Sequence, residues 1–339
     1  MNIQYDVSLK NFSTFKIDAK VKTFYEINNF EDLTILSTIQ DYYILGEGSN
    51  TVFASNNISK SIIKNNLKGI ELIGETNEYM DYEVMSGENF DNFVRFVANQ
   101  NLWGVENLAF MPGSVGAAPI QNIGAFGIEV KDSILEVKGV MCNIPEQVIC
   151  FTNSECKFAY RTSKFKEELG NKFFITSVIF RLYKNGVLNL SYASLTKFIA
   201  DNNLSPVTPE DMVKIVTDIR MKNYPNLQVL GGVGSCFTNV IVDQIKLNEL
   251  KERFPNIVYF DYINGYFKIA TAWLISNNSK YYAGYMYNDN IGLFEKHSLQ
   301  IVNYGNASPS DFIDFTNDIK QEIFNIYGLN IELEPNIVI

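Results

Sequence analysis

The chain has 339 residues, more than one hydrophobic core usually serves, so we expect two or three compact units. Hydrophobic residues make up 46% of the chain and charged residues 19%, and together with 25 Phe and 19 Tyr this composition excludes a disordered protein. A formal net charge of -10 argues against a general nucleic-acid binder, which needs clustered Lys and Arg.

The chain carries no pattern for export or membrane insertion. The opening, MNIQYDVSLKN, lacks the basic-then-apolar order of a signal peptide. No later segment supplies the about 18 uninterrupted apolar residues of a membrane helix. We therefore expect a cytoplasmic protein without membrane insertion, and a monomer.

Three segments predict strands because β-branched and aromatic residues lie between turn-forming boundaries, at 42–46, 82–87 and 173–183. Between the last two, apolar residues recur at helical spacing and predict a helix over 90–101. Its apolar stripe consists of Phe90, Phe93, Val94, Val97 and Ala98.

Two later helices are marked by their first residues. Thr208 as N-cap, followed by Pro209, predicts a helix that ends near Arg220. Its expected buried residues are Met212, Ile215, Val216 and Ile219. Ser308 and the proline after it begin a last long helix that stops at Gly328. Its apolar face consists of Phe312, Phe315, Ile319, Ile323 and Ile326.

The tail over 331–339, IELEPNIVI, predicts a strand. Strands and helices are mixed along the chain without a strict βαβ repeat. This order indicates an α+β architecture in several subdomains.

Cysteine and histidine give no sign of a metal site or a nucleophile. The four cysteines, Cys142, Cys150, Cys156 and Cys236, form no CxxC pair, so we expect no zinc site. The single histidine, His297, lacks the local signature of a Ser-His or Cys-His couple. We expect it to pack or to contact a ligand instead of acting as a base.

Three glycine-rich segments can bring main-chain N–H groups close to phosphate oxygens. They are LGEGSN at 45–50, MPGSVGAAP at 111–119 and QNIGAFG at 121–127. Each alone is more often a simple turn, but the first follows a predicted strand directly, and successive N–H groups there can form an anion-binding nest. Their spacing is not that of the dinucleotide-binding βαβ unit.

The order and spacing of several motifs resemble the UDP-N-acetylenolpyruvoylglucosamine reductases. The similarity starts at NFSTFKID and runs through ILGEGSN, ENLAFMPGSVGAAPIQNIGAFGIEV, KFAYRTSKFK, LSYASL, GSCFTN and LEPNI. The chain is similar to the longer of two family types, which has an extra loop around Tyr192.

The resemblance implies an α+β fold: a two-subdomain FAD-binding fold of the vanillyl-alcohol-oxidase (PCMH) type and a C-terminal substrate-binding α+β domain. We place the first subdomain at 1–66 with 326–339, the second at 67–222 and the substrate-binding domain at 223–325.

The implied reaction reduces UDP-N-acetylglucosamine enolpyruvate to UDP-N-acetylmuramate in peptidoglycan synthesis, with noncovalent FAD as cofactor and NADPH as co-substrate. The residues that match FAD-binding positions are Gly46, Glu47, Gly48, Ser49, Asn50, Pro112, Gly113, Ser114, Gly116, Ala117, Ala118, Ile120, Ile123, Gly124, Tyr160 and Arg220.

Two residues match catalytic positions. Arg161 matches the arginine that faces the substrate carboxylate, where its fixed charge would stabilise an enolate. Ser235 matches the proton donor to carbon, and positioning would compensate for its weak acidity. Without the motifs, Arg161 reads as a surface residue of a Lys-rich loop and Ser235 as part of a turn.

The implied substrate contacts are Tyr192, Asn239 and His297. For Tyr192, simple burial of the aromatic ring in a core is an equally good interpretation. His297 stands where the family has a glutamine, and Asn223 stands where it has a lysine, with Lys222 adjacent.

The third catalytic position differs from the family. Asn336 replaces a glutamate, and Val338 replaces an arginine two residues later. Glu334, two positions earlier, is a candidate substitute. An alternative is therefore a catalytically weakened relative that binds FAD or UDP-sugars. A different flavin oxidase of the same fold, with FAD tethered through histidine, is disfavoured because His297 lies far from the glycine loops in sequence.

Overall fold

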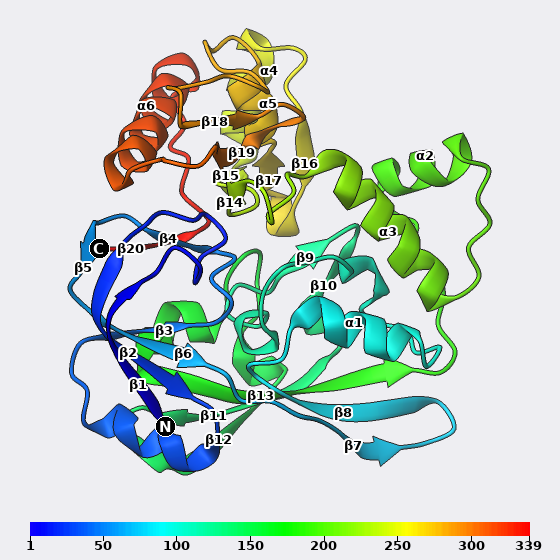
Figure 1. Cartoon of the computed structure of the whole chain (residues 1–339). Helices are drawn as coiled ribbons and strands as arrows, with labels where there is room; N and C mark the ends of the chain where they lie inside the picture. The colour runs from blue at the N-terminus through cyan, green and yellow to red at the C-terminus, as the bar shows by residue number, and fades with distance from the viewer. The chain divides into compact units, whose positions relative to one another are not determined.

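The computed structural model describes residues 1–339 as two compact units (Figure 1). The first unit consists of Met1–Val7, Val21–Glu47 and Ser59–Lys222. The second consists of Ser8–Lys20, Gly48–Ile58 and Asn223–Ile339. The chain passes from one to the other inside the first glycine-rich segment, so each unit holds part of it.

The first unit contains a small sheet with strand order β1-β2-β6-β3. These strands are β1 (Asn2–Ser8), β2 (Lys20–Ile27), β3 (Tyr42–Leu45) and β6 (Ser61–Asn65). The central β6 runs parallel to both β2 and β3. Ile27 and Ile63 pack with Leu33 of the 3-10 helix η1 (Phe30–Ser37), which gives this sheet its own core.

A larger antiparallel sheet follows in the same unit, with order β12-β11-β13-β8-β7. Its strands are β7 (Ile70–Glu75), β8 (Tyr79–Met85), β11 (Ile134–Met141), β12 (Ile144–Thr152) and β13 (Phe173–Tyr183). Helix α1 (Phe90–Ala98) packs on this sheet, since the Phe93 ring lies 4.8 Å from that of Phe180 in β13. The five residues of its predicted stripe are all buried.

Short elements link these parts, and three of the predicted site residues, Gly116, Ala117 and Gly124, lie in them. The short elements are η2 (Glu106–Leu108), η3 (Val115–Ala117), β9 (Gly124–Ala125), β10 (Ile128–Glu129), η4 (Val130–Asp132), η5 (Ser154–Cys156), the π-helix η6 (Phe165–Leu169) and η7 (Gly170–Lys172). Helices α2 (Ala193–Asp201) and α3 (Pro209–Asn223) end the unit.

The second unit holds two three-stranded sheets and one parallel strand pair. The first sheet has the order β14 (Gly231–Gly232), β19 (His297–Asn303) and β18 (Ile291–Phe294). The second has the order β15 (Val240–Val242), β17 (Phe267–Ile269) and β16 (Tyr259–Asp261). Strand β20 (Asn336–Val338) runs parallel to β4 (Thr51–Phe53). The remaining elements are β5 (Asn57–Ile58), α4 (Gln244–Arg253), η8 (Ile263–Gly265), α5 (Thr271–Ser276) and α6 (Pro309–Tyr327).

The predicted elements with strong end signals are confirmed. Strand β13 has the predicted bounds, and α6 begins after an N-cap at Ser308 and ends at Gly328, which has a φ of 64°. Helix α1 is shorter than expected, because Asn99 already acts as its C-cap, and α3 continues past Arg220 to Asn223.

The predicted nine-residue tail strand is wrong. Only Asn336–Val338 forms a strand, and Leu333 makes a single bridge to Phe237. Pro335 separates the two pairings, because it has no N–H to donate to a ladder.

None of the helices combines the length and the apolar composition that crossing a membrane requires. The cytoplasmic location, the monomeric state and the boundaries of the three-part division stay predictions.

Gly48 illustrates how closely the second unit is packed. Its φ is +68°, and a Cβ there would lie 2.0 Å from the Phe12 carbonyl oxygen. Gly265 has a similar φ of +75° with nothing within 4 Å. We expect Gly265→Ala to cost about 1–2 kcal/mol of unfolding free energy. Gly48→Ala should cost on the order of 3–5 kcal/mol, because main chain must move. Denaturant unfolding of the two variants measures this, and equal losses would contradict it.

Candidate active site

Two predicted cofactor loops adjoin in the first unit. A Cβ on Gly46, at the end of β3, would lie 2.5 Å from Ser114 Oγ and 3.6 Å from Ala117 Cβ. Only the small residues Gly46, Ser114 and Ala117 therefore lie where the two loops meet. Small walls of this kind let a ligand approach the main chain closely.

Glu47 holds the first loop against helix α1. The Asn89 Nδ2 donates to both carboxylate oxygens of Glu47, at 3.0 and 2.9 Å. The Oδ1 of the same asparagine caps α1 by accepting from the Asn92 N–H. Glu47 thus fixes the loop, a role that the motif alone did not indicate.

The second loop rests on the end of β8. The N–H groups of Val115 and Gly116 donate to the carbonyls of Glu88 and Ser86, both at 2.8 Å. A Cβ on Gly116 would lie 2.5 Å from Ser86 Cβ. A branched residue at Gly116 would therefore disturb packing, so its replacement alone does not test ligand binding.

Arg161 lies in a tight turn beside the third glycine loop. Ala159 and Thr162 pair across the turn, and Arg161 has a φ of +54°. Its Nη2 donates to the Gly124 carbonyl at 3.1 Å, and its guanidinium lies 5.5 Å from the Tyr160 ring centre. The structure thus brings the predicted residues Tyr160, Arg161 and Gly124 together.

Phe126 joins two predicted residues that are 28 positions apart in sequence. The guanidinium of the buried Arg220 lies 5.6 Å from the Phe126 ring centre. The half-exposed ring of Tyr192 packs edge-on against Phe126, with centroids 5.6 Å apart. Sequence reasoning missed Phe126. The sequence feature that could have indicated it is an aromatic residue inside the third glycine-rich segment, between Gly124 and Gly127. The structure gives Phe126 a φ of +47°.

In the second unit, the tail pairs with the segment that contains Ser235. The Glu334 N–H donates to the Cys236 carbonyl at 2.9 Å, and the Thr238 N–H donates to the Glu332 carbonyl at 3.0 Å. This is an antiparallel pattern in which Glu334 lies opposite Cys236, the neighbour of Ser235. Gly234 precedes Ser235 with a φ of +76°, and a Cβ there would meet nothing within 4 Å.

Glu334 and Asn336 lie in different surroundings. Glu334 is half-buried, and its carboxylate adds to the effect of burial in raising the pKa of the Cys236 thiol. Its carbonyl accepts from Asn50 Nδ2 at 3.3 Å. Asn336 has an exposed side chain and donates its main-chain N–H to the Asn50 carbonyl at 2.9 Å.

The predicted substrate residues Asn239 and His297 both have internal partners. Asn239 Oδ1 accepts from the Thr271 N–H at 3.1 Å, at the start of α5. His297 Nδ1 accepts from the Leu299 N–H at 3.2 Å, and its ring stacks near Tyr224. Burial lowers the pKa of His297. Its ring is therefore neutral at pH 7, with Nε2–H as a donor.

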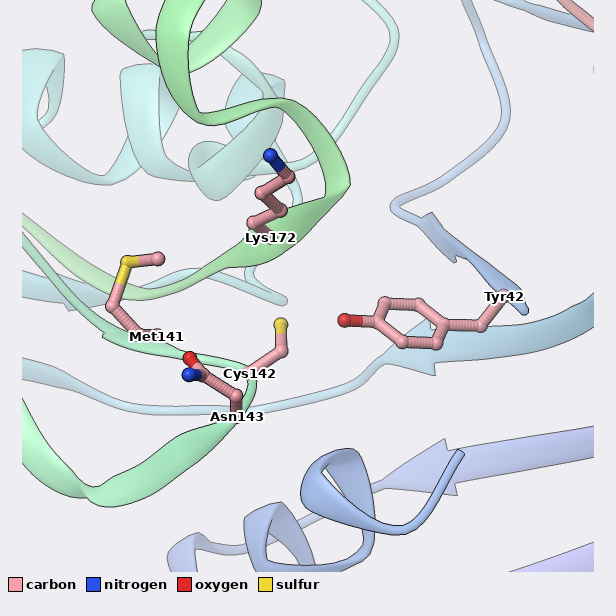
Figure 2. A pocket seen from close by; sticks show the side chains of 5 residues that line it. All are labelled: Tyr42, Met141, Cys142, Asn143 and Lys172. Carbon is pink, nitrogen blue, oxygen red and sulfur yellow. The ribbon is translucent and has the colours of Figure 1, made fainter. Parts of the chain in front are cut away.

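A cavity of about 270 Å³ in the first unit lies among none of the predicted residues (Figure 2). Its lining residues are Tyr42, Met141, Cys142, Asn143 and Lys172. The Tyr42 hydroxyl points toward the Cys142 thiol, and burial raises the pKa of both groups. A protonated thiol is a poor nucleophile, so this cavity has no sign of catalysis.

The fold and the small-walled loops define an FAD-binding α+β protein. The sequence model of an FAD binding domain matches residues 38–143, which include all three glycine-rich segments. The residues present fit this cofactor, because Gly46 carries no side chain and packs so closely on Ser114 that the main chains of both glycine-rich loops lie side by side.

The comparisons then identify the family. The model of the UDP-N-acetylenolpyruvoylglucosamine reductase C-terminal domain matches residues 226–338. The reductase of Flavobacterium johnsoniae is 35% identical over 100% of both chains, and that of Bdellovibrio bacteriovorus is 35% identical over 99% of both. The chain belongs to the UDP-N-acetylenolpyruvoylglucosamine reductase family and is an FAD-dependent oxidoreductase.

A solved structure supports the fold independently. The crystal structure of UDP-N-acetylenolpyruvylglucosamine reductase from Thermus caldophilus matches with a TM-score of 0.69, at 19% identity, over 100% of both chains. The predicted fold class is confirmed, and so is the family resemblance. The individual roles of the site residues stay predictions.

We expect the FAD to be bound noncovalently. The only histidine, His297, lies in β19, outside the residues that match the FAD binding domain. The one cysteine within that match, Cys142, is buried, and burial raises the pKa of its thiol. The purified protein should be yellow and should release its flavin on acid denaturation. A flavin adduct on the denatured chain in mass spectrometry would contradict this expectation.

Proposed function

We propose that the chain reduces the enolpyruvyl ether of UDP-N-acetylglucosamine to the lactyl ether of UDP-N-acetylmuramate, with NADPH as reductant, in peptidoglycan synthesis. The supporting observation is the pairing of the Ser235 segment with the tail that bears Glu334. Full-length similarity to enzymes named for this substrate adds to it. When bound, FAD supplies the hydride to the vinyl carbon.

Arg161 binds the substrate carboxylate in this proposal. Hydride addition leaves negative charge that spreads onto the carboxylate oxygens, and a fixed cation placed there stabilises that charge as it develops. The guanidinium cannot lose its proton at pH 7 and can grip two oxygens at once. Its hydrogen bond to the Gly124 carbonyl sets its direction.

Ser235 delivers the proton to the carbon that bears the ether oxygen. A hydroxyl is a weak acid, but the carbanion is strongly basic, so a fixed position next to it suffices. A Cβ on the preceding Gly234 would meet nothing within 4 Å, so this part of the segment is open to a substrate.

We further propose that Glu334, and not Asn336, supplies the carboxylate that supports this step. Glu334 lies in the tail segment that pairs with the Ser235 segment and is half-buried, where a charge acts more strongly than in water. Asn336 is exposed in β20, and its amide cannot exchange a proton.

The second candidate function is a weakened relative that binds FAD or the UDP-sugar without full turnover. Asn336 and Asn223 favour it, since they stand where the family has a glutamate and a lysine and provide neither charge. Such a protein would bind the substrate but would reoxidise reduced flavin slowly.

Ser235→Ala separates the two halves of the reaction. Flavin reduction by NADPH needs no proton on carbon, so its rate should be unchanged. Reaction of the reduced protein with enolpyruvyl substrate should slow roughly a hundredfold or more. Stopped-flow absorbance of the flavin measures both rates. Equal slowing would mean that Ser235 supports the flavin site and does not donate the proton.

Glu334→Gln and Asn336→Ala distinguish the two tail residues. Glu334→Gln should lower turnover on the order of a hundredfold under saturating NADPH, while Asn336→Ala should leave it nearly unchanged. Glu332→Gln is a matched control, because Glu332 lies in the same tail with an exposed side chain. If Asn336→Ala slows turnover and Glu334→Gln does not, the assignment to Glu334 is wrong.

A further inference from the structure

Asn122 is a fully buried residue at the centre of the contacts between the third glycine loop and the Arg161 turn. Its Nδ2 donates to the Ala159 carbonyl at 3.1 Å and to Glu129 Oε2 at 3.0 Å. Its Oδ1 accepts from the Lys131 N–H at 3.2 Å. One amide group therefore ties three segments of the first unit together.

The turn that Asn122 holds is under strain. Arg161 has a φ of +54°, a conformation that costs a residue with a Cβ about 1–2 kcal/mol. The turn is closed by two hydrogen bonds between Ala159 and Thr162, at 3.0 and 3.3 Å. Strained backbone of this kind persists only where the surroundings determine it.

Other side-chain contacts surround the turn, and one of them joins the Thr162 hydroxyl to Glu167 Oε1 at 2.6 Å. Ser163 Oγ donates to the Ile120 carbonyl at 2.7 Å, after the turn has ended. Lys166 Nζ reaches the Arg161 carbonyl at 3.2 Å from the following π-helix. The Gly124 carbonyl receives the guanidinium itself. The Ala159 carbonyl, where the turn begins, accepts from the Thr162 N–H inside the turn and from Asn122 Nδ2 outside it.

The chemistry of the site requires an asparagine. The Asn122 backbone is left-handed, with a φ of +44°, which asparagine adopts more readily than most residues. The side chain must present one acceptor to an N–H and two donors to a carbonyl and a carboxylate. An aspartate has the same length but no donor when ionised.

We propose that Asn122 is a positioning residue for Arg161. Its amide fixes the Ala159 carbonyl, thereby holds the left-handed turn, and so directs the guanidinium toward its place at the Gly124 carbonyl. The inference rests on the proposed role of Arg161 in binding the substrate carboxylate.

The principal test is Asn122→Asp in the FAD-loaded protein. The carboxylate would face the Ala159 carbonyl and the Glu129 carboxylate, both acceptors, so the turn loses its hydrogen bond to the third glycine loop. Reoxidation of the reduced flavin by enolpyruvyl substrate should slow roughly ten- to a hundredfold, because a small displacement of a catalytic group is costly. Flavin content and flavin reduction by NADPH should stay unchanged.

Asn153→Asp is the matched control. Asn153 Nδ2 donates to the carbonyls of Lys131 and Ile134, both at 2.8 Å, without touching the turn. It should lower thermal stability without separating the two half-reactions. If Asn122→Asp slows both half-reactions equally, or if Asn153→Asp gives the same selective slowing, the proposal is overturned.

A second comparison uses Asn122→Gly, which keeps the left-handed backbone and removes the amide, in the wild-type and the Arg161→Lys backgrounds. Asn122→Gly should slow the substrate half-reaction in the wild-type background. In the Arg161→Lys background it should add little, because both substitutions act through the guanidinium of Arg161. Additive effects, or loss of flavin from both Asn122 variants, would assign Asn122 to the fold alone. If Arg161→Lys itself has no effect, the proposed role of Arg161 fails instead.

Discussion

The main-chain N–H of Glu334 donates to the carbonyl of Cys236, and two residues later the N–H of Asn336 donates to the carbonyl of Asn50. These two bonds bring the end of the chain against two segments that are about 100 and 285 residues away in sequence. Pro335, between them, cannot continue either ladder, so the tail changes partner at that point. The Ser235 segment, the Asn50 segment and the tail therefore share one place in the second unit.

In the first unit, Arg161 and the glycine-rich segments that are predicted to bind FAD lie mostly in short irregular segments. Positive φ values recur there at Asn122, Phe126 and Arg161, all within or beside the third glycine loop. Each such residue costs energy that its surroundings must offset. Buried amide hydrogen bonds do so, and they give the loops the rigidity that long helices give elsewhere in the fold.

Much of this arrangement could be predicted from the sequence, and the exceptions have physical causes. Helix α6 was predictable because Ser308 and Gly328 mark its ends chemically, and β13 because it is rich in β-branched and aromatic residues. Strands of two or three residues, such as β14, are too short for any periodicity. The role of Asn122 depends on partners 7 to 37 residues away that no local pattern specifies.

The central claim is that this family member turns over the enolpyruvyl substrate despite the asparagine at 336. The most direct measurement is a single turnover of the wild-type protein. The flavin is reduced without oxygen, the excess reductant is removed, and UDP-N-acetylglucosamine enolpyruvate is added. Our account predicts that the flavin reoxidises and that one UDP-N-acetylmuramate forms per flavin, as seen by mass spectrometry. A flavin that stays reduced in the presence of saturating substrate would contradict it.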